Sequence, residues 1–487
     1  MAGKDRKLNP KEGRPTGASP CKENKAKKSP VRPTPVKERQ KVQQKQSEEG
    51  PPVLEEPVSS EMARWIKLSI KSLTISRADR SWAAEVVNDF RDNLLKFLRS
   101  CTDQPFFQAA EFINTGSYFE KVKINNPDEF DMMLKLQAPT LLTMTELDGG
   151  LFYRLDLNRP TRDPIQAFLL ENKLTISSSK ILSEMYRLVR KFLKTYKVSD
   201  KRCRWEVNRK RPNSPAVTLS LCRTQNNSEE LISVDVVPAL MVKSTQGWPH
   251  AARNGPNVGN WLGKKTWQEI KSSSCFFVPK RLKGGNIGED AKESWRISFS
   301  LIEKKIITCH GNSKTCCENN GSKCCRKQCL MLLKSLIEGL KLRFPKELDG
   351  LCSYHGKTIF LHTLSIRFSD TMWAREQLPT CFMDLLCAFE DHVRRRVLPH
   401  FFVPECNLFS SACISRKALT FLAGALDEQK RTGLPLLMPP APVKPLTPPA
   451  GTRPSIAEPT AHSLQPGLIN KLILVFAVVV ICALFLV

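Results

Sequence analysis

The chain has 487 residues, of which 75 are Lys or Arg and 48 are Asp or Glu, so its formal net charge is +27 at pH 7. This length allows more than one domain, and this charge favours nucleic acid or anionic lipid as a partner over cationic partners. The 17 cysteines are scattered and odd in number, and no hydrophobic signal opens the chain, which disfavours a secreted disulfide scaffold. We therefore expect reduced thiols and a location in the cytosol and nucleus.

Residues 1–60 are rich in Lys, Gln, Pro and Glu and have almost no aromatic residues. Such a segment cannot bury enough apolar surface to offset the entropy of ordering, so we predict a disordered basic tail. A tail that only keeps the protein soluble is the alternative. Positive clusters recur far beyond it, however, which favours a polyanionic partner.

Residues 61–295 are predicted to form a mixed sheet flanked by helices. The run SWAAEVVNDFRDNLLKFLRS has apolar residues at helical spacing and predicts a long amphipathic helix, with a basic segment leading into it. Four short runs rich in β-formers follow and are bounded by Pro, Asn and Gly; they are DEFDMMLKL, LFYRLDL, AVTLSLC and ISVDVVPAL. These runs predict strands.

Residues 296–432 return to helical spacing, as in RKQCLMLLKSLIEGLKLRF and TCFMDLLCAFEDHVRRRVL, and predict a second, helical lobe. The expected class is α+β, with two lobes and a cleft between them. Residues 433–467 are rich in Pro and predict a semi-rigid linker.

The C-terminal residues 468–487 are strongly apolar. The sixteen uncharged residues 472–487 would reach about 24 Å as a helix, short of a hydrocarbon core of roughly 30 Å. Thinner membranes tolerate shorter spans, so a tail anchor in an intracellular membrane is our expectation. An amphipathic or aggregation-prone end is the alternative.

Two acids, Glu129 and Asp131, lie within one apolar strand and share a face, because side chains alternate along a strand. A third acid, Asp235, interrupts the β-branched run ISVDVVPAL. Neighbouring carboxylates in a low dielectric are stable as anions only with cations between them, and Mg²⁺ is a hard, oxygen-seeking cation. Three acids can hold two such ions, which can activate a hydroxyl and stabilise a leaving pyrophosphate.

A Gly-Ser turn, Gly116 and Ser117, precedes the acidic strand and can offer backbone N–H groups and a hydroxyl to phosphate oxygens. Each motif alone is common in solvated turns and strands. Together, in this order and with an Asp about a hundred residues later, they are typical of polymerase-β-like nucleotidyltransferases.

Six segments resemble the cyclic GMP-AMP synthases of the mab-21-like family, in the same order, across roughly residues 61–430. They are NTGSYFEKVKINNPDEFDMMLKL, SPAVTLSL, ISVDVVPAL, WRISFSLIEK, HGNSKTCCENN and CNLFSS. The resemblance implies a bilobal nucleotidyltransferase activated by double-stranded DNA, as a homodimer on that DNA. It implies ATP and GTP as substrates and cyclic GMP-AMP, an innate immune second messenger, as product. A relative activated by double-stranded RNA, and a catalytically idle DNA- or membrane-binding scaffold, are the alternatives.

The resemblance also assigns residues to the site. The ligands of two Mg²⁺ ions, or of Mn²⁺ in their place, would be Glu129, Asp131 and Asp235. The nucleotide-binding residues would be Thr115, Gly116, Ser117, Arg296, Ser298, Ser300, Glu303, Lys334, Ser353, Tyr354 and Lys357. Among them Arg296 would read a base edge and Tyr354 would stack on a base, although a core Tyr is the alternative for Tyr354.

The segment CHGNSKTCCENNGSKCCRKQC holds six Cys and one His in 21 residues. Within its ribbon, residues 310–324, the resemblance makes His310, Cys316, Cys317 and Cys324 the ligands of one structural Zn²⁺. Three thiolates and one imidazole complete a tetrahedral site without an open position for water. A redox cluster is the alternative, but adjacent Cys316 and Cys317 could form only a strained ring disulfide.

Three basic clusters are the predicted DNA-binding surface. They consist of Lys71, Arg77 and Arg80; of Arg209, Lys210 and Arg211; and of Lys323, Arg326 and Lys327 beside the zinc ribbon. Phosphate contacts give affinity without sequence information, as a general DNA sensor requires. For each single residue a solvated surface charge is the alternative.

Overall fold

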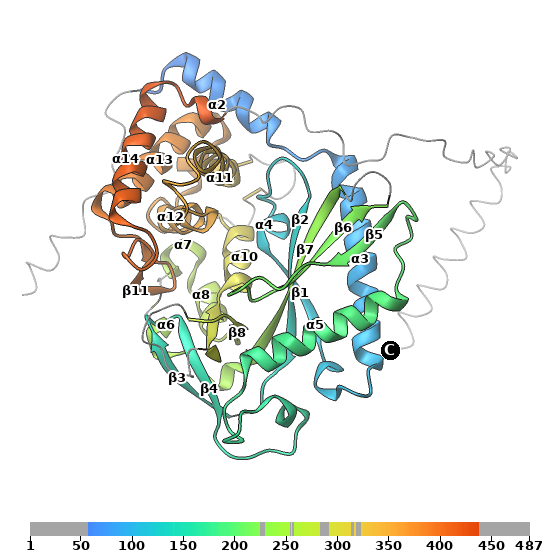
Figure 1. Cartoon of the computed structure of the whole chain (residues 1–487). Coiled ribbons are helices and arrows are strands. Elements are labelled where there is room, and N and C mark those ends of the chain that lie inside the picture. Colours follow the sequence, from blue (N-terminus) through green and yellow to red (C-terminus); the bar gives the residue numbers. More distant parts are fainter. Residues whose placement is uncertain are drawn as a thin grey trace, which may run out of the picture. The chain divides into compact units, whose positions relative to one another are not determined.

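The computed structural model describes residues 57–139, 141–224, 229–253, 255, 258–282, 292–312, 316–317 and 323–437 (Figure 1). Nearly all of the predicted basic tail, nearly all of the predicted linker and the predicted membrane anchor lie outside these residues. Within the described ranges, no helix combines the length and the apolar character needed to cross a bilayer.

The N-terminal part contains two helices, α2 (Ser60–Ser72) and α3 (Arg77–Ser100). The predicted amphipathic helix is confirmed in α3, whose buried residues recur every three or four positions from Ala83 to Leu98. The basic segment before it also contains a helix, α2, whose buried Ile66 and Ile70 lie on the side that packs against the C-terminal helices α11 and α13. The Ser76 side chain accepts a hydrogen bond from the Asp79 N–H and so caps α3.

A nine-stranded mixed sheet forms the centre of the fold, in the order β1-β2-β7-β8-β9-β4-β3, with β6 also paired to β7 and β5 to β6. The strands are β1 (Glu111–Thr115), β2 (Glu129–Gln137), β3 (Leu142–Asp148), β4 (Phe152–Leu157), β5 (Cys203–Val207), β6 (Val217–Arg223), β7 (Glu230–Val242), β8 (Cys275–Pro279) and β9 (Trp295–Ser298). The four predicted strands are confirmed as β2, β4, β6 and β7. The predicted α+β class is therefore confirmed as well.

The long strand β7 organises the sheet, because it pairs in parallel with β2 and antiparallel with β6 and β8. Its pairing with β6 ends at Val236 and its pairing with β8 begins at Leu240. Pro238, which has no N–H to donate, falls in the gap between them. Helix α5 (Ser178–Thr195) packs against the sheet with an apolar stripe that runs from Ile181 to Phe192.

The C-terminal helices gather on one side of the sheet (Figure 1). They are α10 (Ser300–Thr308), α11 (Arg326–Arg343), α12 (Ser353–Ile366), α13 (Leu378–Arg395) and α14 (Arg416–Arg431), with the hairpin of β10 (Pro399–His400) and β11 (Val403–Asn407). The predicted helices are confirmed in α11 and α13. The domain boundary predicted at residue 296 falls inside β9, which pairs with β8 and β4, so the sheet continues to Ser298.

Short helices complete the described chain. They are α4 (Gly116–Phe119), α6 (His250–Arg253), α7 (Gly259–Leu262) and α8 (Lys264–Lys271), with 3-10 turns at Pro105–Phe107, Pro164–Phe168, Ser244–Gln246, Asp370–Trp373, Arg375–Gln377 and Pro435–Leu437. Helix α4 follows β1 directly, which places the Gly-Ser turn at the end of a sheet strand.

Candidate active site

A row of polar side chains crosses the sheet where β1, β2, β7 and β6 lie side by side. Asp131 and Asp235 are direct partners in the parallel pairing of β2 with β7. Thr115 on β1 is the register partner of Asp131, and Thr218 on β6 is the register partner of Asp235. The Thr218 hydroxyl donates to Asp235 Oδ1 at 2.6 Å. Phe130 and Met132, on the opposite face of β2, are buried in the core, as the strand pattern predicts.

The Gly-Ser turn approaches Asp131 so closely that only glycine fits. Gly116 has a φ of +80°, and a Cβ there would lie 2.1 Å from Asp131 Oδ2. Because glycine has no Cβ, the backbone can turn directly above the carboxylate. Thr115 and Gly116 line the cavity described below, whereas Ser117 is half-buried next to it.

The pKa values of the two aspartates are raised by burial and by neighbouring negative charge. Burial, followed by repulsion from Glu129 and Asp235, raises the pKa of Asp131 to about 6. Burial likewise raises the pKa of Asp235. A cation between the two carboxylates would remove this penalty, so the donor set fits Mg²⁺ or Mn²⁺.

Glu129 is more exposed than the two aspartates, although its charge still contributes to the raised pKa of both. Its side chain is 60% exposed and accepts from Lys123 Nζ at 3.0 Å. A metal held by all three predicted carboxylates would therefore compete with Lys123 for Glu129, whose Oε2 is the atom paired with that ammonium. The three acids are accordingly less tightly gathered than the His–Cys cluster described below.

A cavity of about 390 Å³ opens beside this row. It brings together ten of the predicted residues: Thr115, Gly116, Asp131, Asp235, Arg296, Ser298, Ser300, Glu303, Tyr354 and Lys357. Glu129, Ser117, Lys334 and Ser353 are not in its lining. Lys334 is buried on α11 and donates to the Val122 carbonyl at 3.2 Å, and Ser353 is exposed at the first residue of α12.

Lys357 is held inside the protein by two buried carboxylates. Its ammonium lies 2.8 Å from Glu120 Oε1 and 3.1 Å from Glu303 Oε2. Burial alone would lower the pKa of Lys357, but Glu303 and Glu120 outweigh it and raise that pKa. A phosphate can therefore reach this ammonium only in competition with two internal ion pairs.

Glu120 is a cavity residue that the sequence analysis missed. Its side chain is fully buried, and Oε2 has no hydrogen-bond partner among the described residues. An unpartnered carboxylate oxygen at a cavity wall is available to a ligand donor. The segment GSYFEKVK does not indicate that Glu120 belongs to the site, because its partner Lys357 lies 237 residues away in the sequence.

His400 is a second missed residue, and it orients Tyr354. Its Nδ1 accepts the backbone N–H groups of Phe402 and Val403, both at 3.2 Å, so the proton lies on Nε2. That Nε2–H donates to the Tyr354 hydroxyl at 2.9 Å, and the hydroxyl donates to Glu303 Oε1 at 3.0 Å. Burial lowers the pKa of His400 to about 4, so the imidazole stays neutral.

Replacing His400 with Phe should raise the KM for nucleotide several-fold with a smaller change in kcat, because the lost hydrogen bond is worth about 1 kcal/mol. The variant His400→Gln keeps a donor and should recover most of the loss. Because the imidazole stays neutral, titration of His400 should not change the wild-type KM between pH 8 and about pH 5. Steady-state kinetics across this range test both points, and an unchanged KM in His400→Phe contradicts the assignment.

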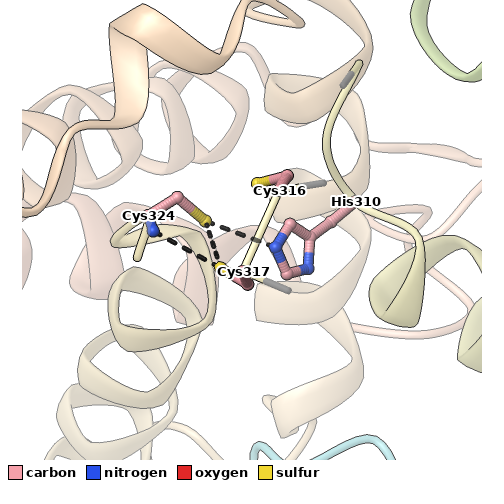
Figure 2. Close-up of side chains that lie close together, drawn as sticks. All are labelled: His310, Cys316, Cys317 and Cys324. Atoms are coloured by element: carbon pink, nitrogen blue, oxygen red, sulfur yellow. Dashed lines mark hydrogen bonds between the residues drawn. The ribbon is translucent and has the colours of Figure 1, made fainter. Parts of the chain in front are cut away.

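The predicted zinc ligands converge as a His–Cys cluster formed by His310, Cys316, Cys317 and Cys324, whose ligand atoms lie within 4.8 Å of one another (Figure 2). The Sγ atoms of Cys317 and Cys324 are 3.6 Å apart, and His310 Nε2 is 3.3 Å from Cys324 Sγ. Ligands at Zn–S distances of about 2.3 Å span tetrahedral edges of about 3.7 Å, so this spacing fits zinc.

The imidazole of the cluster is prepared to act as a ligand. His310 Nδ1 is 2.9 Å from the Ile307 carbonyl, which fixes its proton there and turns the Nε2 lone pair toward the thiols. Burial lowers the pKa of His310 to about 4, which keeps the ring neutral. Each cysteine in the described part of the chain is a free thiol, including adjacent Cys316 and Cys317.

Most of the predicted DNA-binding residues are exposed, namely Lys71, Arg77, Arg80, Arg209, Lys210, Arg211 and Lys323. Lys327 is half-buried, and burial lowers its pKa. The prediction for Arg326 needs correction, because its side chain is fully buried and forms an ion pair with Asp370 at 2.9 Å. The sequence places Arg326 among basic residues, but the first turn of α11 directs its guanidinium into the protein.

Comparison with known proteins agrees with this architecture. Residues 118–308 match the Mab-21 protein nucleotidyltransferase domain, and residues 325–428 match the Mab-21 protein HhH/H2TH-like domain. The chain is 38% identical to the cyclic GMP-AMP synthase of Mus musculus over 372 residues, which cover 76% of this chain and 70% of the relative.

Two further relatives extend this likeness. The cyclic GMP-AMP synthase of Sus scrofa is 36% identical, over 75% of this chain and 71% of the relative. A cyclic GMP-AMP synthase-like receptor of Magallana gigas is 26% identical, over 72% of this chain and 55% of the relative. The chain therefore belongs to the cyclic GMP-AMP synthase family of Mab-21 nucleotidyltransferases.

Proposed function

We propose that this nucleotidyltransferase is activated by double-stranded DNA and joins ATP and GTP into cyclic GMP-AMP, an innate immune second messenger. The observation that carries the proposal is the pair of aspartates, Asp131 and Asp235, in register on adjacent strands and facing one cavity. The likeness to cyclic GMP-AMP synthases supports the product.

The residues around the cavity have separate tasks in this reaction. Mg²⁺ held by Glu129, Asp131 and Asp235 would supply the Lewis acid that activates a ribose hydroxyl and shields the triphosphate. The Gly116 turn would bring backbone close to the phosphates, and the planar donors of Arg296 suit the edge of a guanine base. Tyr354, fixed by His400 and Glu303, would present its ring to a base.

The exposed basic residues of α2, α3 and the β5–β6 connection supply the charge for binding a phosphate backbone. DNA is favoured over RNA as activator because an RNA-activated relative would read A-form geometry and would not need the His–Cys cluster, beside which Lys323 is exposed. We place the reaction in the cytosol and nucleus, where the free thiols stay reduced, and we expect two copies to bind together on DNA.

The direct test incubates purified protein with ATP, GTP and Mg²⁺, with double-stranded DNA, double-stranded RNA or no nucleic acid, and identifies products by mass. We expect cyclic GMP-AMP with DNA alone, in amounts that rise with DNA length. Product with RNA alone favours the RNA-activated alternative, and no product under any condition favours the idle scaffold.

Charge removal tests the DNA surface separately. The variant Arg77→Glu with Arg80→Glu should weaken DNA binding and reduce the slope of log affinity against log salt by about 1 per lost phosphate contact. The control is Arg416→Glu with Lys417→Glu, which makes the same charge change at exposed residues of α14 outside the predicted clusters. Equal loss in both variants indicates a general effect of net charge.

A further inference from the structure

Arg326 is the most deeply buried cation of the described chain, and its partners surround the His–Cys cluster. Its side chain is 0% exposed. Nη1 lies 2.9 Å from Asp370 Oδ1 and 3.6 Å from Cys316 Sγ, and Nη2 donates to the Phe368 carbonyl at 3.1 Å. A guanidinium out of water is costly unless such partners hold it, so this position is specified by the groups around it.

Asp370 connects this arginine to the other end of the cluster. Its Oδ1 also accepts the Asn312 backbone N–H at 3.1 Å, and its own N–H donates to Asn312 Oδ1 at 3.3 Å. Asn312 lies two residues after the ligand His310. Asp370 therefore fastens the segment that carries the histidine, while Arg326 contacts the cysteine.

The intervening Gly311 shows how closely these groups pack. A Cβ at Gly311 would lie 2.3 Å from the Cys316 Cβ and 2.9 Å from Asp370 Oδ1. The carbonyl of His310 accepts from Trp261 Nε1 at 2.9 Å, which fixes the backbone of the ligand from a third side. The cluster is thus held from α7, from α11 and from the turn at residue 370.

We infer that Arg326 and Asp370 are positioning residues for the metal of the His–Cys cluster, with Arg326 donating to the Cys316 thiolate and Asp370 fixing the His310 segment. Zinc with three thiolates and one imidazole carries a net charge of about −1, which a neighbouring guanidinium stabilises. This inference rests on the proposed zinc site. It assigns Arg326 to metal retention in place of DNA contact.

Arg367 offers a matched control, because it packs against the same tryptophan as Arg326. The guanidinium carbons of Arg326 and Arg367 lie 5.5 and 5.3 Å from the ring centroid of Trp373. Arg367 is also largely buried and forms an ion pair with Asp384, but it makes no contact with the cluster ligands. Arg367 does donate to the Met372 carbonyl in the turn that carries Asp370, so substituting it removes a comparable buried arginine and a contact of that turn, but no hydrogen bond to a cluster ligand.

The test measures how fast zinc leaves the purified, zinc-loaded full chain when a chromophoric chelator is added. We expect Arg326→Met and Asp370→Asn each to release zinc 10- to 100-fold faster than wild type, the usual effect of removing a partner of a metal ligand. Arg367→Met should stay within about twofold of wild type, and the double variant should be little worse than either single variant because both act through one contact chain.

Cobalt substitution gives a second readout. The visible spectrum of the Co²⁺ form should shift in Arg326→Met, because a thiolate loses its donor, and should return toward wild type in Arg326→Lys. Wild-type release rates in Arg326→Met, or equally fast release in Arg367→Met, overturn the inference. If Arg326→Met does not fold, Asp370→Asn alone decides it. A wild-type chain that binds no zinc refutes the metal assignment itself, which is a different result.

Discussion

Replacing Asp131 with Asn should reduce dinucleotide synthesis by at least about a thousandfold while DNA affinity stays within about twofold. The carboxylate lies at the centre of the polar row, and an amide oxygen cannot supply the charge that a divalent metal needs. The substitution does not change any of the basic residues proposed to bind DNA, so the charge of that surface is kept. Product formation is measured by mass, and DNA affinity by fluorescence anisotropy.

The matched control is Asp128→Asn, which removes a neighbouring carboxylate that pairs with Lys123 and does not line the cavity. This variant should retain most of its activity. Substantial product from Asp131→Asn would contradict the assignment of Asp131 as a metal ligand, whereas equal loss in Asp128→Asn would point to a general effect of charge.

The same substitution should stabilise the protein when no Mg²⁺ is added. The pKa of Asp131 is raised from 3.8 to about 6 in the fold, so the folded state holds its proton to a higher pH than the unfolded state. The contribution of Asp131 to wild-type stability should therefore fall as the pH rises from about 4 to about 6 and remain lower above that window. Asn does not titrate. The gain in free energy of unfolding for Asp131→Asn should be small at pH 4 and on the order of 2 kcal/mol at pH 7.5, measured by denaturant unfolding.

The sequence predicts the acidic row because it depends on local pattern. Alternation along β2 places Glu129 and Asp131 opposite Phe130, and β-branched neighbours mark the strand of Asp235. The strands β1, β3, β5, β8 and β9 were not predicted. They are short, or, like β3, half-exposed and polar, so their pairing partners decide their conformation.

Contacts between distant segments account for what the sequence could not show. Glu120 and His400 become site residues only because α12 brings Lys357 and Tyr354 against them. From the sequence, Arg326 is expected to be a surface cation like Lys327. Residues of α11 are buried around much of the helix, however, and Arg326 is one of them. A basic cluster in a sequence therefore does not reveal which of its members points inward.

Removing two of the metal ligands should abolish activation by DNA while the rest of the protein stays folded. We expect Cys316→Ser with Cys317→Ser to lose zinc, DNA binding and DNA-stimulated synthesis together, with DNA-stimulated product reduced at least about tenfold, because two of four ligands are gone. The cooperative unfolding of the rest of the protein should persist, since neither Cys316 nor Cys317 belongs to the buried core of the sheet and helices.

The cluster joins the end of α10, a helix that lines the cavity, to the start of α11, so its loss should reach the chemistry through α10. His310 follows α10, whose first turn carries Ser300 and Glu303 into the cavity, and Cys324 precedes α11. The control is Cys309→Ser, an exposed neighbour outside the cluster, which should keep its zinc and its response to DNA. Metal content by mass spectrometry, DNA binding and product are measured on the same samples. If zinc is lost while DNA activation persists, the cluster only stabilises its own loop, because a metal that shaped the DNA-binding surface could not be removed without weakening that surface.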